Sequence, residues 1–203
     1  MAWGKSGTPS TLDSIGDVMT ISDLTVNKFN VFLQHSPYDT SYVNPKITIN
    51  NDTGSLYALR ANYNGGSDGT SVSQAGIIQD GSGTADDKFI VAYVVAISGE
   101  EKLLISNLAN NGTAGAGNAP NRTETVGKYV PSTLTNTIDR IDSTNGSAGS
   151  YAVSSNLSAL GSDITPAAAI PFAENAQVGS RAEITDTRKM YHYTYDWFLE
   201  GTT

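Results

Sequence analysis

Asn-Gly and Asp-Gly dipeptides divide this chain into short apolar runs. They occur at residues 64–65, 68–69, 80–81, 111–112 and 145–146, and both dipeptides tolerate the positive φ of tight turns. The runs between them are rich in β-branched and aromatic residues. No stretch of a dozen residues keeps a helical apolar period free of Gly and Pro. The chain is therefore predicted to be all-β and antiparallel.

Ten strands are predicted, enough for the two sheets of an antiparallel β-sandwich of jelly-roll-like type. They are 17–22, 28–35, 46–50, 56–60, 71–78, 88–98, 101–109, 122–130, 137–142 and 150–154. Residues 89–97 are apolar throughout, which is typical of a central strand buried on both faces. Ser98-Gly99-Glu100 is expected to turn this strand into the next one.

The 203 residues suit one large sandwich with a small appendage. The sandwich is predicted to cover 1–161. A connector is expected over 162–178, because two prolines there bracket small residues and prevent a long helix. Residues 179–203 are predicted to form a small aromatic β-hairpin around Thr194-Tyr195-Asp196.

Composition excludes several classes of function. The net charge of −8 comes from 20 acidic and 12 basic residues, so direct nucleic-acid binding is disfavoured. The absence of cysteine removes disulfides, thiolate metal sites and cysteine nucleophiles. The first residues lack an apolar segment, and no run reaches the roughly 20 apolar residues that span a bilayer. We expect no signal peptide and no membrane insertion.

No motif points to an active site, and the chain is predicted not to be an enzyme and to need no cofactor. Gly4-Lys5-Ser6 lacks the upstream glycine, strand and helix of a phosphate-binding loop. His35 and His192 show no metal-binding spacing. The adjacent acids at 86–87 and 100–101 would point to opposite faces of a strand, so they cannot flank one bond.

Two Asn- and Asp-rich segments leave calcium open as an alternative to plain turn chemistry. Residues 50–54 and 64–70 contain carboxylate and amide oxygens, which are the ligands that calcium prefers, although neither segment has EF-hand spacing. Turn chemistry is the favoured interpretation, and no metal site is predicted.

Four aromatic residues near the C-terminus are the candidate contact residues. Tyr191, Tyr193, Tyr195 and Trp197 would lie on one face if the segment were straight. Tyr and Trp are common at interfaces, and flat aromatic rows can also stack on sugars. Packing or a subunit interface is favoured over glycan binding. A glycan site would also use loop residues such as Tyr57 and Tyr63.

Two patterns carry a resemblance to a known group of proteins. Residues 183–191, Glu-Ile-Thr-Asp-Thr-Arg-Lys-Met-Tyr, followed by Trp197, resemble a short motif common near the ends of tailed-phage structural and tail-associated proteins. A longer pattern resembles uncharacterised proteins of environmental, largely marine, phages. It comprises Trp3, Lys5, residues 51–60, residues 64–66, residues 114–122 and residues 126–128.

The resemblance implies a virion structural protein that assembles in the host cytoplasm. It would be a capsid-decoration or fibre subunit, or a tail-associated subunit. Its partners would be copies of itself, with a homotrimer expected by analogy, and other capsid or tail subunits. The alternative is a glycan-binding adhesion module for recognition of the host surface. The resemblance transfers no catalytic residues.

Overall fold

A computed structural model of the chain describes residues 3–24, 28–133, 137–162, 181–184, 189–193 and 197–199. Strands and loops account for all of these ranges. The described residues contain no helix that could cross a membrane. The chain divides into two compact units, Met1–Ile164 and Thr165–Thr203. The prediction of an all-β fold is confirmed.

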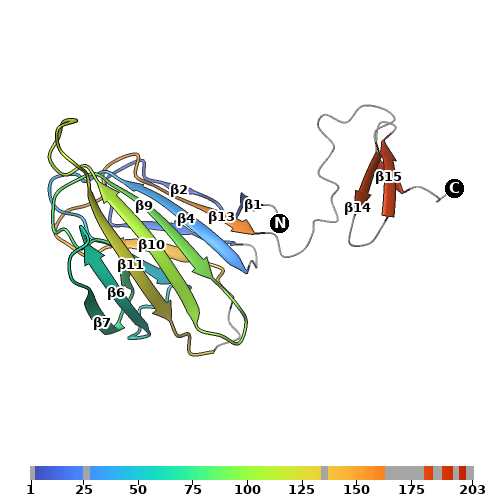
Figure 1. Ribbon diagram of the computed structural model, residues 1–203, viewed down its shortest axis with the longest axis horizontal. Coiled ribbons are helices and arrows are strands. Elements are labelled where there is room, and N and C mark those ends of the chain that lie inside the picture. Colours follow the sequence, from blue (N-terminus) through green and yellow to red (C-terminus); the bar gives the residue numbers. More distant parts are fainter. Residues whose placement is uncertain are drawn as a thin grey trace. The chain divides into compact units, whose positions relative to one another are not determined.

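The larger sheet of the first unit has nine strands, and each pairing within it is antiparallel. Figure 1 shows its central strands side by side in one layer. Across the sheet the order is β1 (Trp3–Lys5), β13 (Asn156–Ser162), β4 (Phe29–Ser36), β9 (Lys88–Val95), β10 (Lys102–Asn110), β11 (Asn121–Tyr129), β6 (Tyr57–Tyr63) and β7 (Gly69–Gln74), with β2 (Ser10–Thr11) also paired to β13.

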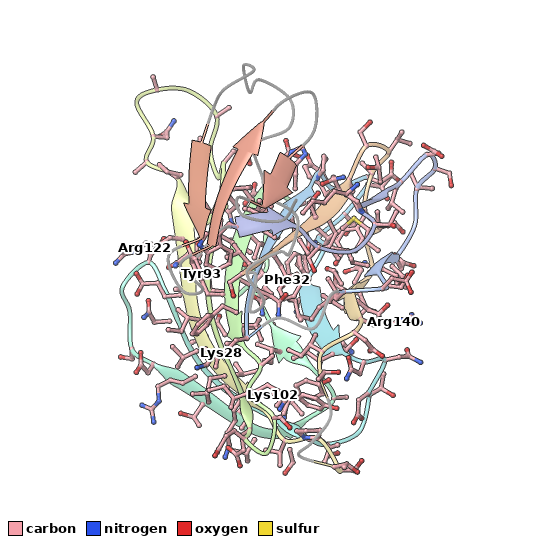
Figure 2. All side chains as sticks on the ribbon, turned by 90° about the vertical axis from the view of Figure 1, so that its right-hand side faces the viewer. Lys28, Phe32, Tyr93, Lys102, Arg122 and Arg140 are labelled. Atoms are coloured by element: carbon pink, nitrogen blue, oxygen red, sulfur yellow. The ribbon has the colours of Figure 1, made fainter. Side chains whose placement is uncertain are left out.

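The smaller sheet has four strands and packs on one face of the larger sheet. Its order is β3 (Val18–Ile21), β12 (Ile141–Asn145), β5 (Pro45–Ile49) and β8 (Ile77–Ile78). The core between the sheets joins Phe32, Val94 and Leu104 of the larger sheet to Met19 and Ile47 of the smaller one. In Figure 2, Phe32 lies between Arg122 and Arg140, which are on opposite sides of the sandwich.

The sandwich is as predicted, and its jelly-roll-like character stays a prediction. Most predicted strands overlap observed ones. The prediction was wrong at 150–154, where only Tyr151 makes bridges, to Gly16 and Tyr38, and the strand begins later at Asn156. β1 and β2 were not predicted, because they are short and gain order only by pairing with the distant β13.

The prediction that residues 89–97 are buried on both faces was wrong. β9 alternates, so that Ile90, Ala92 and Val94 are buried while Phe89 is 50% and Tyr93 52% exposed. The smaller sheet covers only the inner face of the larger one. β9 is central within its sheet, between β4 and β10, but its outer side faces solvent. Its continuous apolar sequence therefore exceeds what the core of a single chain uses.

The second unit contains a three-stranded antiparallel sheet. It consists of β14 (Arg181–Ile184), β15 (Lys189–Tyr193) and β16 (Trp197–Leu199), in that order. β15 and β16 pair around residues 194–196, as predicted for the hairpin. β14 is an additional strand. The connector predicted over 162–178 lies outside the described residues, except for Ser162, which ends β13.

Four tyrosines predict loss of stability at alkaline pH. Burial raises the pKa of Tyr42 and of Tyr129 to about 12, and it also raises the pKa of Tyr57 and of Tyr151. An unfolded tyrosine ionises near pH 10. The contribution of these tyrosines to the free energy of unfolding should therefore be constant below pH 10 and should fall as the pH rises toward 12.

The measurement is a pH titration of tyrosinate absorbance alongside circular dichroism. We expect these four of the ten tyrosines to ionise only as the sheet signal is lost. Ionisation of all ten near pH 10 with the sheet signal intact would contradict this account.

Candidate functional site

The outer face of the larger sheet carries an apolar row that crosses five adjacent strands. Strand register places one residue from each strand opposite the next. In order, the apolar row is Leu160 of β13, Val31 of β4, Tyr93 of β9, Ile105 of β10 and Val126 of β11. Leu160 is 36%, Tyr93 52%, Ile105 56% and Val126 49% exposed.

Neighbouring positions on the same face widen this row into a patch. Leu103 precedes Ile105 by two residues on β10 and is 54% exposed. Phe89 precedes Tyr93 by four residues on β9, so it lies on the same face of the sheet. We call the six exposed apolar residues the outer patch: Phe89, Tyr93, Leu103, Ile105, Val126 and Leu160. With about half of each large side chain accessible, the outer patch leaves on the order of 500 Å² of apolar surface in water. This is at the upper end of the 300–600 Å² typical of the largest patch on a monomer.

Ion pairs line the outer patch on the β11 side. Arg60 lies 3.4 Å from Asp68, and Lys128 lies 2.9 Å from Glu101. A third pair joins the β11 neighbours Arg122 and Glu124 at 3.4 Å. Each of these side chains is about half exposed, so the pairs add little stability. Their consequence is that this side of the patch carries balanced charge.

The acidic excess of the chain lies partly beside the smaller sheet. Six aspartates lie in its strands or within three residues of them, against two basic residues. These aspartates are Asp17, Asp23, Asp52, Asp80, Asp139 and Asp142, of which Asp80 and Asp142 are buried, and the basic residues are Lys46 and Arg140. A net charge of −8 would oppose the meeting of two copies through an acidic surface. The outer patch is a surface where that repulsion is small.

A depression of about 300 Å³ lies beside the apolar row, over β6, β10 and β11. Ile105 and Val126 contribute apolar surface to it. Its polar lining includes Arg60, Asn62, Asp68, Asn107 and Glu124. The Asn62 amide donates a hydrogen bond of 3.3 Å to Glu124 Oε2. The depression can hold a small polar group or a sugar ring next to apolar surface.

The aromatic residues predicted as contacts are placed on two strands. Tyr191 and Tyr193 belong to β15 and Trp197 to β16, with Tyr193 opposite Trp197 in the register. The four residues would share one face only in a straight segment, and the chain reverses between β15 and β16. Tyr195 lies outside the described residues. Contact of these residues with a partner or a glycan stays a prediction.

Tyr57 cannot serve as a glycan contact, contrary to the prediction. Its side chain is 1% exposed, and its ring stacks on Tyr129 with centroids 4.8 Å apart. Its hydroxyl accepts a hydrogen bond from Ile49 N and donates one to Asp52 O, each 2.9 Å long. Tyr57 therefore belongs to the core. Tyr63 is half-buried at the end of β6.

In the two segments considered for calcium, side-chain oxygens accept hydrogen bonds from donors within the chain. Asp52 Oδ1 accepts from Gly54 N and Oδ2 from the Tyr129 hydroxyl. Asn64 Oδ1 accepts from Arg122 N. The bond from Gly54 N is local to its turn, whereas the bonds from Tyr129 and Arg122 tie these segments to β11. Among the described residues, no group of three or more histidines or acids is placed to hold a metal ion.

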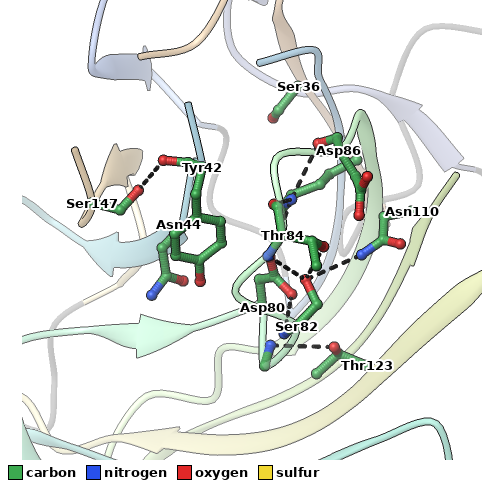
Figure 3. A network of polar contacts seen from close by, with 12 residues as sticks. Ser36, Tyr42, Asn44, Asp80, Ser82, Thr84, Asp86, Asn110, Thr123 and Ser147 are labelled. Carbon is green, nitrogen blue, oxygen red and sulfur yellow. Dashed lines mark hydrogen bonds and ion pairs between the residues drawn. The ribbon is translucent and has the colours of Figure 1, made fainter. Parts of the chain in front are cut away.

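A buried polar cluster also lies in the loop between β8 and β9, and it was not predicted from the sequence. Figure 3 shows this loop gathered around Asp80, Ser82 and Thr84. The ammonium of Lys88 lies 3.2 Å from Asp80 Oδ2, and both side chains are 0% exposed. Lysine and aspartate are almost never fully buried unless they are paired. The only early sign was the position of Lys88 at the start of an apolar run.

Comparison with protein-family models, with curated proteins and with solved structures found no match to this chain.

Proposed function

We propose that the chain is a structural subunit of a tailed-phage particle that acts by self-association and by docking on other particle proteins. The resemblance noted in the sequence supports the phage assignment. The observation that carries the assembly role is the outer patch, a large apolar surface on a face that the smaller sheet leaves open. The proposed partner on this face is a second copy of the chain.

Three properties of the face favour a second copy. The continuous apolar sequence of residues 89–97 is typical of a strand covered on both faces. A standard interface buries about 800 Å² per partner, which the outer patch approaches once its polar rim is included. The balanced rim charges allow two acidic chains to meet.

The geometry of contact sets the stoichiometry. Contact between the outer patches of two copies is isologous and gives a two-fold dimer. The homotrimer expected by analogy would require the patch to meet a different surface of the next copy. The mass of the assembly, two or three times 21.3 kDa, separates the two arrangements.

The phage assignment is tested on particles of a phage that encodes this chain. Mass spectrometry of density-purified particles should detect the chain at a fixed ratio to the major capsid protein, and cryo-electron microscopy should place it on the head or the tail. Complete absence of the chain from infectious particles would contradict the assignment while leaving self-association to be measured separately.

The depression over β6, β10 and β11 supports glycan binding as a second candidate function. Its amide and carboxylate groups beside Ile105 and Val126 match the mixed polar and apolar surface of a sugar. We expect Asn107→Ala combined with Glu124→Ala to weaken binding to host-surface glycans at least about tenfold, because two hydrogen-bonding groups are lost. A glycan array with the variant and the unaltered chain measures this. An array without hits for the unaltered chain would contradict it.

A further inference from the structure

The loop around the buried pair Lys88 and Asp80 holds the ammonium nitrogen of Lys88 in a fixed position. Nζ of Lys88 donates hydrogen bonds of 3.0 Å to Thr84 O and 3.1 Å to Asp86 O. The ring of Tyr42 lies 5.5 Å from Nζ. An ammonium has three N–H positions, so two are held by loop carbonyls and one is left for Asp80. The loop thus fixes the position of the nitrogen.

Asp80 is held at one carboxylate oxygen and open at the other. Its Oδ1 accepts a hydrogen bond of 2.7 Å from Ser82 N. Its Oδ2 lies 3.2 Å from Lys88 Nζ, yet it accepts no hydrogen bond from the described residues. Gly81 N donates to Thr123 Oγ1 and the Asn110 amide donates to Ser82 Oγ, which anchors the loop to the larger sheet (Figure 3).

We propose that Lys88 and Asp80 condense to an intramolecular amide bond between Nζ and Cγ. One proton first passes from Nζ to Oδ2 of Asp80, which leaves an amine and a carboxylic acid. The nitrogen lone pair then attacks Cγ, and the Cγ–Oδ2 bond breaks. Nζ keeps one hydrogen, and two hydrogens leave with Oδ2 as water. The step needs no other reactant.

The described groups supply what such a step requires. The two side chains are 0% exposed, so bulk water is kept from the reacting atoms. Nζ of Lys88 lies 3.2 Å from Oδ2 of Asp80, and holding the amine beside the carboxyl group in this way removes much of the entropic barrier. The Ser82 N–H at Oδ1 is placed to stabilise the negative charge that develops on that oxygen during attack. A lysine amine freed of its proton is an effective nucleophile.

The amide would join the two sheets of the sandwich covalently. Asp80 follows β8 of the smaller sheet by two residues, whereas Lys88 begins β9 of the larger sheet. A bond between them closes a short loop and prevents the start of β9 from separating from the end of β8. This chain has no cysteine, so an amide is a cross-link that remains available to it. The inference does not depend on the proposed function.

The test is intact-mass and peptide-mass spectrometry of the purified full chain. We expect the chain to be lighter than its sequence by one water. Trypsin cuts after lysine and arginine, and an acylated Lys88 resists it. Residues 61–102 should therefore remain one looped peptide that lacks one water, instead of separating into 61–88 and 89–102.

Variants distinguish the amide from other losses of water. Asp80→Asn should release ammonia instead of water and reach the same final mass as the unaltered chain. Lys88→Arg should keep the full mass of its sequence. Asp80 precedes Gly81, and an Asp-Gly bond can also lose water by forming a succinimide. In that case trypsin would still cut after Lys88 and the loss would lie in 61–88. That pattern, or an unaltered chain of full mass, would overturn the proposal.

Discussion

Replacement of Ile105 by aspartate is expected to raise the dissociation constant of the self-associated chain at least about a hundredfold. Ile105 lies beside Tyr93, the middle residue of the apolar row, and is 56% exposed in the single chain. In a patch-to-patch contact, each copy would bring one unpaired carboxylate into the interface, where a charge without a partner costs several kcal/mol. Sedimentation velocity over a concentration series measures the change.

Two valines provide a matched comparison for this result. Val126 on β11 is 49% exposed within the outer patch, and Val18 on β3 of the smaller sheet is 50% exposed. We expect Val126→Asp to weaken association as Ile105→Asp does, and Val18→Asp to leave it unchanged. Equal effects of the two valine substitutions would show that added charge alone, and not the outer patch, governs association.

Replacement of Lys88 by methionine is expected to lower the free energy of unfolding by about 3–5 kcal/mol. Methionine keeps much of the side-chain volume but can form neither the proposed amide nor an ion pair. The carboxylate of Asp80 therefore stays buried without a partner, and the hydrogen bonding of Nζ to the loop carbonyls is lost. Against a typical total of about 5–15 kcal/mol, this is a large loss. Urea unfolding followed by circular dichroism measures it.

A variant at an exposed ion pair and a double variant at the buried pair test whether the unpaired buried charge causes the loss of stability. Lys128→Met removes an ion pair with Glu101 whose side chains are 45% and 42% exposed, so its cost should stay below about 1 kcal/mol. Asp80→Leu combined with Lys88→Met also removes the unpaired buried carboxylate and should recover the part of the loss that comes from that charge. The part that comes from the proposed covalent bond should stay lost. A Lys88→Met chain that is as stable as Lys128→Met would disprove the role assigned to the buried pair.

Much of the sandwich could be predicted from local patterns. Strands around Lys28–His35 and Arg122–Val130 were predicted within a residue or two of β4 and β11. The turn at Ser98-Gly99-Glu100 is confirmed, with Gly99 at φ 83° between β9 and β10. These features depend on residue type and period, which the sequence states directly.

Features that depend on distant pairing were beyond local patterns. β13 lies between β4 and β1, and nothing near residues 156–162 indicates either neighbour. The burial of Lys88 and Lys102 at 1% exposure each reverses the usual preference of lysine for solvent. Each is the first residue of a strand, where loop carbonyls accept its ammonium hydrogens. Only the three-dimensional course of those loops reveals these acceptors.

The apolar residues of the outer patch are visible in the sequence, where they led to the prediction of a strand buried on both faces. Residues 89–97 and Leu103-Leu104-Ile105 are apolar at consecutive positions, so both faces of β9 and β10 carry apolar side chains. The prediction of burial on both faces was wrong for the single chain, in which Phe89 and Tyr93 are about half exposed. One chain provides only the inner cover, and the proposal assigns the outer cover to a second copy.

Sedimentation equilibrium of the unaltered full chain tests the outer patch as a self-association surface most directly. The account predicts a weight-average mass that rises with concentration from 21.3 kDa toward an integral multiple, and that stays near 21.3 kDa for Ile105→Asp. A mass of one chain at every concentration, for the unaltered chain as for the variant, would contradict it.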